Sequence, residues 1–182
     1  MRILESNRLI LKPVEKEDLS FLLDLRWEGD IMDYLIHDPI SSQSQQVWYE
    51  NILKNKDLAL SIFLKNEIDS KKTTIVGTVG LYNFNLRHQR ATWRIRISSE
   101  YQGKGIAYES IYMLLDYGFN TLNINKIISD SFSDNLAIIK LSKKLGFIEE
   151  GTLREHYFHK GHFRDAIIFG LLREDFNKKA KG

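Results

Sequence analysis

Residues Gln102-Gly103-Lys104-Gly105-Ile106-Ala107 decide how the rest of the chain is interpreted, because they join a predicted strand to a predicted helix through a glycine-rich turn. Before the turn, residues 92–97 alternate between hydrophobic and polar side chains, which is typical of a strand with two different faces. After the turn, one helical stripe carries Ala107, Ile111, Leu114, Leu115 and Leu122. A turn that opens a helix presents backbone N–H groups and the positive end of the helix dipole, which together attract phosphate groups.

The ligand that this turn predicts most simply is a pyrophosphate. Gly103 and Gly105 allow phosphates to approach the backbone closely, and Lys104 adds a positive charge. Two glycines in a turn are also ordinary turn chemistry, so the pair alone is not specific. The turn lacks the GK[ST] ending of a P-loop, and it lacks the third glycine and the strand-helix-strand context of a Rossmann fingerprint.

A second motif follows farther along the chain. Asn135-Leu136-Ala137 opens a predicted helix that ends in Leu141-Ser142-Lys143-Lys144-Leu145-Gly146-Phe147, with Gly146 in a C-cap position. In this order, the two motifs resemble the signatures of the GNAT superfamily of N-acetyltransferases, Q/R-x-x-G-x-G/A and an Asn-headed helix that ends in K-x-G-F. Residues 88–91, 117–119, 122–123 and 161–165 are similar to the branch that holds ribosomal-protein N-terminal (RimJ/RimL-like) and spermidine acetyltransferases.

The order of elements predicts a mixed α/β fold, with a mainly antiparallel mixed sheet and helices on both faces. We expect strands at 8–12, 58–64, 75–81, 92–97 and 126–132, and a final hairpin of 151–158 with 163–172. We expect helices at 18–27, from a capping box of Ser42 and Gln45 onward, at 106–122 and at 135–145. The resemblance implies that the fourth strand carries a bulge and splays from the fifth.

Composition restricts the class of protein. The 182 residues, with 43% hydrophobic and 27% charged, predict a single cytoplasmic globular domain over residues 1–182, with a core of about 8–175 and a frayed basic tail at 176–182. The resemblance implies that this domain is an N-acetyltransferase. A net charge of +2 is too weak to indicate a nucleic-acid partner. No signal peptide or apolar run of roughly 18 residues indicates a membrane, and the sequence has no cysteine. Three of the five histidines, His156, His159 and His162, cluster at the predicted hairpin turn and could bind a metal, but no carboxylate pattern accompanies them, so we expect solvated loop histidines and no metal. A homo-oligomer is left open.

The resemblance implies acetyl-CoA as the cosubstrate and direct transfer of its acetyl group to a primary amine. The pantetheine arm would lie along the backbone of Ile95, Arg96 and Ile97, and the pyrophosphate would lie on the glycine turn. Asn135 would contact the arm, and lysines of its helix would lie near the nucleotide phosphates, although a solvated helix face explains those lysines equally well. The expected cofactor-binding residues are Ile95, Arg96, Ile97, Gln102, Gly103, Lys104, Gly105, Ile106, Ala107, Asn135, Lys140 and Lys143 or Lys144.

Two departures from the family pattern bear on catalysis. Ser142 stands where relatives usually have the tyrosine that protonates the leaving thiolate, and Thr92 stands where the spermidine-acetylating relatives have a glutamate. A serine hydroxyl can donate a hydrogen bond to sulfur, so Ser142 is the candidate catalytic residue, with an incidental helix position as the alternative. The departures also leave open a non-catalytic acyl-CoA-binding sensor or interaction domain.

The acceptor is the least determined part of the prediction. The acidic residues Glu28, Asp30, Asp33 and Asp38 follow the first helix and favour a cationic amine such as a polyamine, while a protein N-terminal amine is the other leading class. We expect Glu28, Asp33 and Thr92 to bind the acceptor, and Glu28, Glu155 and Asp165 are candidate bases. Arg94 and Arg96 share one face of their strand and could contact an acidic acceptor or a cofactor phosphate, or simply lie on the surface.

Overall fold

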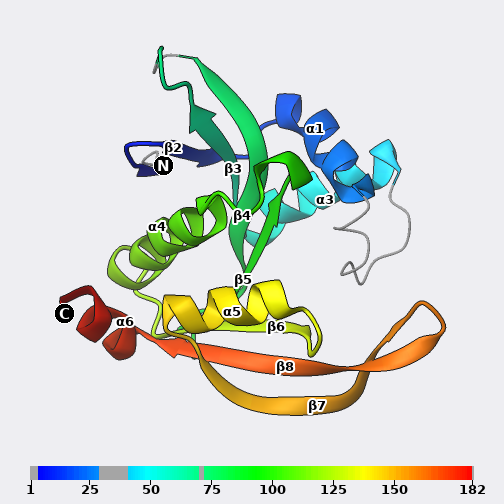
Figure 1. The fold of residues 1–182 in the computed structure, drawn as a ribbon, viewed down its shortest axis with the longest axis vertical. Coiled ribbons are helices and arrows are strands. Elements are labelled where there is room, and N and C mark those ends of the chain that lie inside the picture. Colours follow the sequence, from blue (N-terminus) through cyan, green and yellow to red (C-terminus); the bar gives the residue numbers. More distant parts are fainter. Residues whose placement is uncertain (1–3, 29–40, 70–71, 182) are drawn as a thin grey trace.

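The computed structural model describes residues 4–28, 41–69 and 72–181 (Figure 1). Its centre is an eight-stranded mixed sheet with the order β1-β2-β3-β4-β5-β6-β8-β7. The strands are β1 (Leu4–Glu5), β2 (Leu9–Pro13), β3 (Leu58–Lys65), β4 (Thr73–Asn85), β5 (Arg90–Ile97), β6 (Lys126–Phe132), β7 (Ile148–His159) and β8 (His162–Leu172). The helices are α1 (Leu19–Asp24), α3 (Ser42–Asn55), α4 (Ile106–Asn120), α5 (Leu136–Leu145) and α6 (Arg173–Lys181), with short 3-10 turns η1 (Lys16–Asp18), η2 (Leu25–Trp27) and η3 (Ser99–Tyr101).

Helices cover both faces of the sheet, as predicted. One core cluster includes Leu60 and the apolar side of α4, and a second includes Ala59, Leu22 of α1 and Tyr49 of α3. Because neighbouring residues of a strand point to opposite faces, Ala59 and Leu60 assign the two clusters to opposite sides of β3. The mixed α/β class and the helices on both faces are confirmed.

The sheet splays between β5 and β6, which also confirms the prediction. These two strands form the parallel pair of the sheet, and their register runs only from Arg90–Lys126 to Thr92–Ile128. The expected bulge in residues 92–97 is wrong: their pairing with β4 is regular, and the register shifts between Tyr82 and Asn85 of β4 instead. Asn83 takes up the extra residue with φ 55°, a conformation that asparagine tolerates better than most residues.

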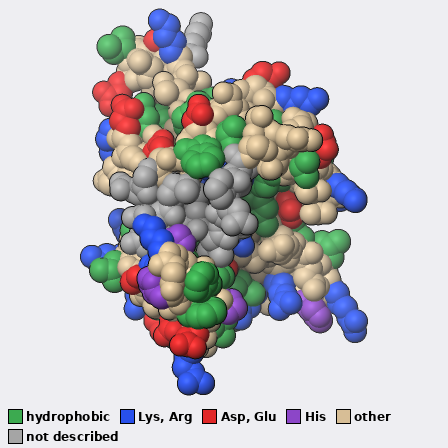
Figure 2. Space-filling view, turned by 90° about the vertical axis from the view of Figure 1, so that its right-hand side faces the viewer, with side chains coloured by type: hydrophobic (Ala, Val, Ile, Leu, Met, Phe, Trp, Pro, Cys, Tyr) green, Lys and Arg blue, Asp and Glu red, His purple; other side chains and the backbone are tan. Residues whose placement is uncertain are grey.

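The final hairpin is confirmed, with longer strands than expected. β7 and β8 are joined by Lys160 and Gly161, whose φ values of 48° and 86° suit a tight two-residue turn. Histidine and hydrophobic side chains gather on this side of the molecule (Figure 2), and Phe158 and Phe163 pack their rings 5.1 Å apart near the tip.

Three expected boundaries are wrong. The N-cap of α3 is Ser41 and not Ser42, because the Ser41 side chain accepts the hydrogen bond from the Ser44 backbone N–H. Helix α4 ends at Asn120, so Leu122 lies beyond it and is partly exposed. The expected frayed tail begins inside α6, whose Phe176 is buried against Phe119 and Tyr112, with ring centroids 5.3 Å away in both cases.

Replacing Phe176 by alanine is therefore expected to destabilise the fold by about 3–5 kcal/mol, because it removes a buried ring and leaves a cavity. Urea unfolding at equilibrium measures this loss. Lys178→Ala in the same helix is the control, since Lys178 is exposed and should leave the midpoint nearly unchanged. Equal midpoints for both variants would show that α6 does not contribute to the core.

Candidate active site

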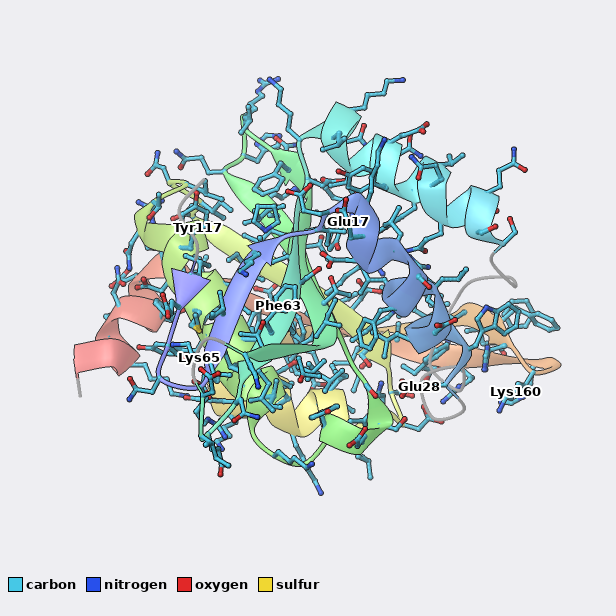
Figure 3. The ribbon with its side chains drawn as sticks, turned by 90° about the horizontal axis from the view of Figure 1, so that it is seen from above. Glu17, Glu28, Phe63, Lys65, Tyr117 and Lys160 are labelled. Carbon is cyan, nitrogen blue, oxygen red and sulfur yellow. The ribbon has the colours of Figure 1, made fainter. Side chains whose placement is uncertain are left out.

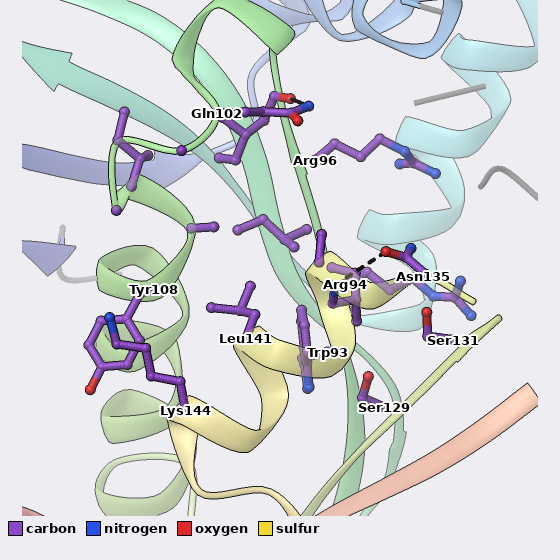
Figure 4. A pocket seen from close by; sticks show the side chains of 18 of the residues that line it. Trp93, Arg94, Arg96, Gln102, Tyr108, Ser129, Ser131, Asn135, Leu141 and Lys144 are labelled. Atoms are coloured by element: carbon purple, nitrogen blue, oxygen red, sulfur yellow. Dashed lines mark hydrogen bonds between the residues drawn. The ribbon is translucent and has the colours of Figure 1, made fainter. Parts of the chain in front are cut away.

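The gap between β5 and β6 holds an open pocket of about 530 Å³ (Figure 4). Its walls are residues 93–97 of β5, residues 129–132 of β6, the turn and first residues of α4 at 101–103 and 105–108, and Asn135, Ala137, Ile138, Leu141 and Lys144 from α5 and its N-cap. The volume lies within the range that small-molecule and cofactor sites occupy.

The glycine turn before α4 is accessible from the pocket, and hydrogen bonds from neighbouring side chains hold it in place. Gly103 and Gly105 have φ values of 72° and 78°, which an L side chain rarely adopts, and no atom lies within 4 Å of a Cβ added at Gly103. The Gln102 side chain donates to the Ile97 carbonyl over 3.1 Å. Arg8 donates to the Lys104 carbonyl over 3.3 Å and forms an ion pair with Glu109. The turn therefore leaves its backbone accessible to a ligand, and the residues present fit a pyrophosphate at a helix N-terminus.

The pocket collects ten of the twelve residues that were expected to bind the cofactor. Lys104 and Lys140 do not line it: the Lys104 ammonium lies 5.1 Å from the Tyr101 ring centroid, and Lys140 is exposed on α5. Lys144 lies at the pocket, 4.7 Å from the ring centroid of Tyr108. These placements support the expected roles of the lining residues, which stay predictions.

Asn135 has a structural reason for its position. Its side-chain oxygen accepts from the Ile138 backbone N–H over 3.2 Å and caps α5, while the residue also borders the pocket. Its amide nitrogen remains able to donate to a ligand. The helix cap and the ligand contact are therefore compatible in one side chain.

Ser142 is not placed as a proton donor would be. Its side chain is fully buried, its hydroxyl makes no hydrogen bond within the described part of the chain, and the residue does not line the pocket. Its neighbour Leu141 faces the pocket instead. This arrangement favours a packing role for Ser142 over the expected catalytic one.

We expect Ser142→Ala to keep the kcat of the parent protein and to be equally stable or more stable by up to about 1 kcal/mol, since a buried hydroxyl without a partner costs free energy. Steady-state kinetics and urea unfolding measure the two effects. Ser110→Ala, at an equally buried and unpartnered serine of α4, is the control. A loss of kcat by about tenfold or more with unchanged acetyl-CoA affinity would restore Ser142 to the catalytic machinery.

The residues expected to bind the acceptor do not meet in the pocket. Glu28 follows η2 (Figure 3), and its carboxylate accepts from the Ser99 N–H over 2.6 Å and from the Ser99 hydroxyl over 2.7 Å. Burial by itself would raise the pKa of Glu28, but the hydrogen bonds from Ser99 and Ser98 outweigh it and lower that pKa. Thr92 ends the β5–β6 pairing outside the pocket lining, and Asp33, with Asp30 and Asp38, lies outside the described residues.

The other two candidate bases are also placed elsewhere. Neither Glu155 nor Asp165 lines the pocket, and the Asp165 carboxylate accepts from the Glu155 backbone N–H over 2.8 Å. That contact lies within the β7–β8 hairpin and holds the irregular part of β7, where Glu155 has φ 49°. A structural role explains this pair.

One acidic residue that sequence reasoning missed does line the pocket. Asp130 of β6 accepts a hydrogen bond from the Tyr157 hydroxyl, and its second carboxylate oxygen makes no hydrogen bond within the described ranges. Burial and this hydrogen bond raise the pKa of the Tyr157 phenol, so Tyr157 stays a donor toward Asp130 at neutral pH. The sequence does show a charged residue within a predicted central strand, which is unusual and could have drawn attention to Asp130. The sequence does not show that Asp130 contacts β7.

Three arginines lie on the side of β5 that faces away from Tyr108 and Lys144. We call Arg26, Arg94 and Arg96 the arginine cluster. The side chains of Arg94 and Arg96 point away from Tyr108 and Lys144 (Figure 4). Arg26 is only 6% exposed and lies over the Trp48 ring, 5.3 Å from its centroid. Burial and the neighbouring charge of Arg26 lower the pKa of Arg96 to about 10, and burial raises the pKa of the nearby Tyr82 to about 12.

Within residues 4–28, 41–69 and 72–181, no helix is long and apolar enough to cross a membrane. The same residues contain no group of three side chains that is arranged to hold a metal ion.

Comparisons with known proteins agree with this geometry. Residues 8–148 match the model of the acetyltransferase (GNAT) domain family. The chain is similar to the spermidine N(1)-acetyltransferase of Escherichia coli K12, with 33% identity covering 91% of this chain and 87% of that protein. It is also similar to the spermidine N(1)-acetyltransferase of Vibrio cholerae, with 28% identity covering 97% of this chain and 99% of that protein. A crystal structure of the Vibrio cholerae enzyme in complex with CoA and spermine superposes with a TM-score of 0.84 and 29% identity, covering 94% of this chain and 99% of that one.

Proposed function

Because the chain belongs to the GNAT acetyltransferase family, we propose that it acetylates the primary amine of a small molecule that enters the β5–β6 gap from the side of the arginine cluster. The protein is an acetyl-CoA-dependent N-acetyltransferase. The observation that carries the proposal is the pocket itself, which joins an open glycine turn to a gap between two strands.

The residues present fit acetyl-CoA, which supplies the acetyl thioester when it is bound. The turn at Gly103 and Gly105 and the N-terminus of α4 would hold the pyrophosphate. The backbone of Ile95, Arg96 and Ile97 borders the gap where β6 no longer pairs with β5, so it is available to the pantetheine arm. Backbone N–H groups at such a position also stabilise the oxyanion of a tetrahedral intermediate.

Asp130 is our candidate for the group that removes the proton from the acceptor. An ammonium ion has no lone pair, so it must lose a proton before its nitrogen attacks a thioester. Asp130 lies in the pocket with one oxygen oriented by Tyr157 and the other without a hydrogen bond among the described residues. A carboxylate held in this way can accept the proton directly or through one water molecule.

The relatives support a polyamine as the first acceptor to test. The two relatives described above are spermidine N(1)-acetyltransferases, and the superposed crystal structure contains spermine. Of the acidic residues expected to favour such an acceptor, Glu28 is hydrogen-bonded to Ser99, and Asp30, Asp33 and Asp38 lie outside the described residues.

The test is the release of free CoA from acetyl-CoA in the presence of spermidine, spermine and shorter amines, with the acetylated product identified by mass. We expect release to require both acetyl-CoA and a primary amine. If acetyl-CoA binds but no amine accelerates CoA release, the chain is a non-catalytic acyl-CoA-binding module and the proposed function is wrong.

A further inference from the structure

The side chains of the arginine cluster have no role in the acetyl transfer proposed above. Arg94 and Arg96 line the pocket, and buried Arg26 lies close enough to Arg96 for its charge to act on it. None of the three forms an ion pair with any described residue. We propose that this cluster binds an oxyanion, in the first place a carboxylate, carried by the acceptor whose primary amine is acetylated. The inference rests on the proposed acetyl transfer and assigns to it an acceptor class that differs from the polyamines of the relatives.

Without a bound anion, the arginine cluster has an unfavourable electrostatic free energy. Guanidinium groups remain charged in proteins, and burial of such a charge without an ion-pair partner costs free energy, which applies to Arg26 and in part to Arg96 but not to the exposed Arg94. Here the like charges of Arg26, Arg94 and Arg96 also repel one another around Tyr82. A carboxylate matches the planar fork of a guanidinium through two parallel hydrogen bonds, so an acceptor that carries one would remove both penalties on binding.

The phosphates of CoA do not explain the cluster. They are expected at the glycine turn before α4, and Lys144 and Tyr108 mark that side of the pocket. The side chains of Arg94 and Arg96 project from β5 in the opposite direction (Figure 4). The backbone of residues 95–97 can therefore border the pantetheine arm while the arginine side chains face the acceptor.

The amine end of such an acceptor has its own partner. Asp130 stands on β6, across the gap from β5, and its carboxylate attracts an ammonium group. Arg94 is near enough to the Asp130–Tyr157 pair for its charge to oppose the raised pKa of Tyr157. Among the described residues, the acceptor side therefore combines one carboxylate with the guanidinium groups of the cluster, which fits a zwitterionic amine better than a molecule with several positive charges.

The test compares amines of equal length that differ only at the far end. 4-Aminobutanoate, butylamine and putrescine present a carboxylate, a methyl group and a second ammonium, and glycine, 6-aminohexanoate and O-phosphoethanolamine extend the series in length and in the type of anion. We expect kcat/KM to be highest for a carboxylate-bearing member, and roughly tenfold or more above that of its uncharged partner of equal length, as expected for a charged hydrogen bond. A phosphorylated amine as the best acceptor would keep the oxyanion site and change its ligand. A preference for putrescine or spermidine over every anionic amine would overturn the inference and leave the proposed acetyl transfer intact.

Variants connect that preference to the cluster. Arg94 is exposed, so Arg94→Gln should fold, and we expect it to raise KM for the anionic acceptor by roughly tenfold while acetyl-CoA affinity is unchanged. Arg94→Glu should shift the preference toward putrescine. Arg90→Gln is the matched control, since Arg90 is an exposed arginine of the same strand that does not line the pocket. If Arg90→Gln and Arg94→Gln changed KM equally, the change would come from the loss of a surface charge and not from a contact with the acceptor, and the inference would be overturned.

Discussion

Gly105→Glu is expected to abolish the stabilisation of the protein by acetyl-CoA. Gly105 is the N-cap of α4 with φ 78°, and we expect its N–H group and those of the residues that follow to bind the pyrophosphate. A glutamate there adds a negative charge and a side chain at the point where phosphates must approach. For the parent protein, acetyl-CoA at about 100 times its Kd should add about 2.7 kcal/mol of stability, or roughly 5–10 °C in Tm for a chain of this size. In Gly105→Glu we expect no shift in a thermal denaturation series.

The control is Gly161→Glu, which makes the same change at a glycine with φ 86° in the β7–β8 turn, where no atom lies within 4 Å of the added Cβ. It should lose a comparable amount of stability from backbone strain and keep the full acetyl-CoA shift. Gly105→Ala separates strain from charge, and we expect it to keep part of the shift. A full shift in folded Gly105→Glu would rule out the turn as the cofactor site.

The fold was predictable because its strongest sequence signals are local. The alternation of residues 92–97, the glycine turn and the Asn135–Phe147 segment each follow from neighbouring residues, and together they locate the splayed pair of strands. The bulge was not predictable in the same way, because an extra residue in β4 or in β5 produces a similar alternation. Helix α6 was mistaken for a tail because its many charges obscured the single anchor Phe176.

The site likewise contains residues that local sequence predicts and residues whose placement depends on long-range packing. The pocket-lining residues that we expect to bind the cofactor were predictable, since most of them lie within two continuous segments. The Asp130–Tyr157 contact was not, because it depends on a register shift between Leu153 and Tyr157 in the pairing of β7 with β8. The approach of Arg26 to Arg96 likewise depends on how the helical segment before Glu28 packs on the sheet, which no spacing in the sequence specifies.

The splay also explains why an ordinary strand residue can be placed for catalysis. Asp130 comes two residues after Ile128, where the pairing of β6 with β5 ends, so its side of the strand borders a ligand gap and not a neighbouring strand. The hydrogen bond from Tyr157 then fixes one carboxylate oxygen. Position in the gap and a fixed orientation meet the geometric requirement for a general base.

Asp130→Asn is therefore expected to lower kcat/KM by roughly 10²–10⁴-fold with any acceptor that is protonated at neutral pH, because an amide cannot take the proton from an ammonium ion. Acetyl-CoA affinity, measured by thermal shift, should be unchanged. Tyr157→Phe should show a smaller loss, since it removes only the group that orients Asp130. Asp116→Asn on α4 is the control for loss of a carboxylate, because Asp116 is exposed and outside the pocket.

A second acceptor distinguishes proton removal from a general loss of structure. Trifluoroethylamine is largely uncharged at neutral pH, so it has no proton to lose before attack, and Asp130→Asn should acetylate it with a much smaller deficit than it shows with butylamine. Equal deficits for the two amines would assign Asp130 to positioning of the acceptor and not to proton transfer. Full activity of Asp130→Asn with butylamine would remove Asp130 from the mechanism. Butylamine has a single charged group, its ammonium, so no second charged contact between this acceptor and the protein could hide the loss of Asp130.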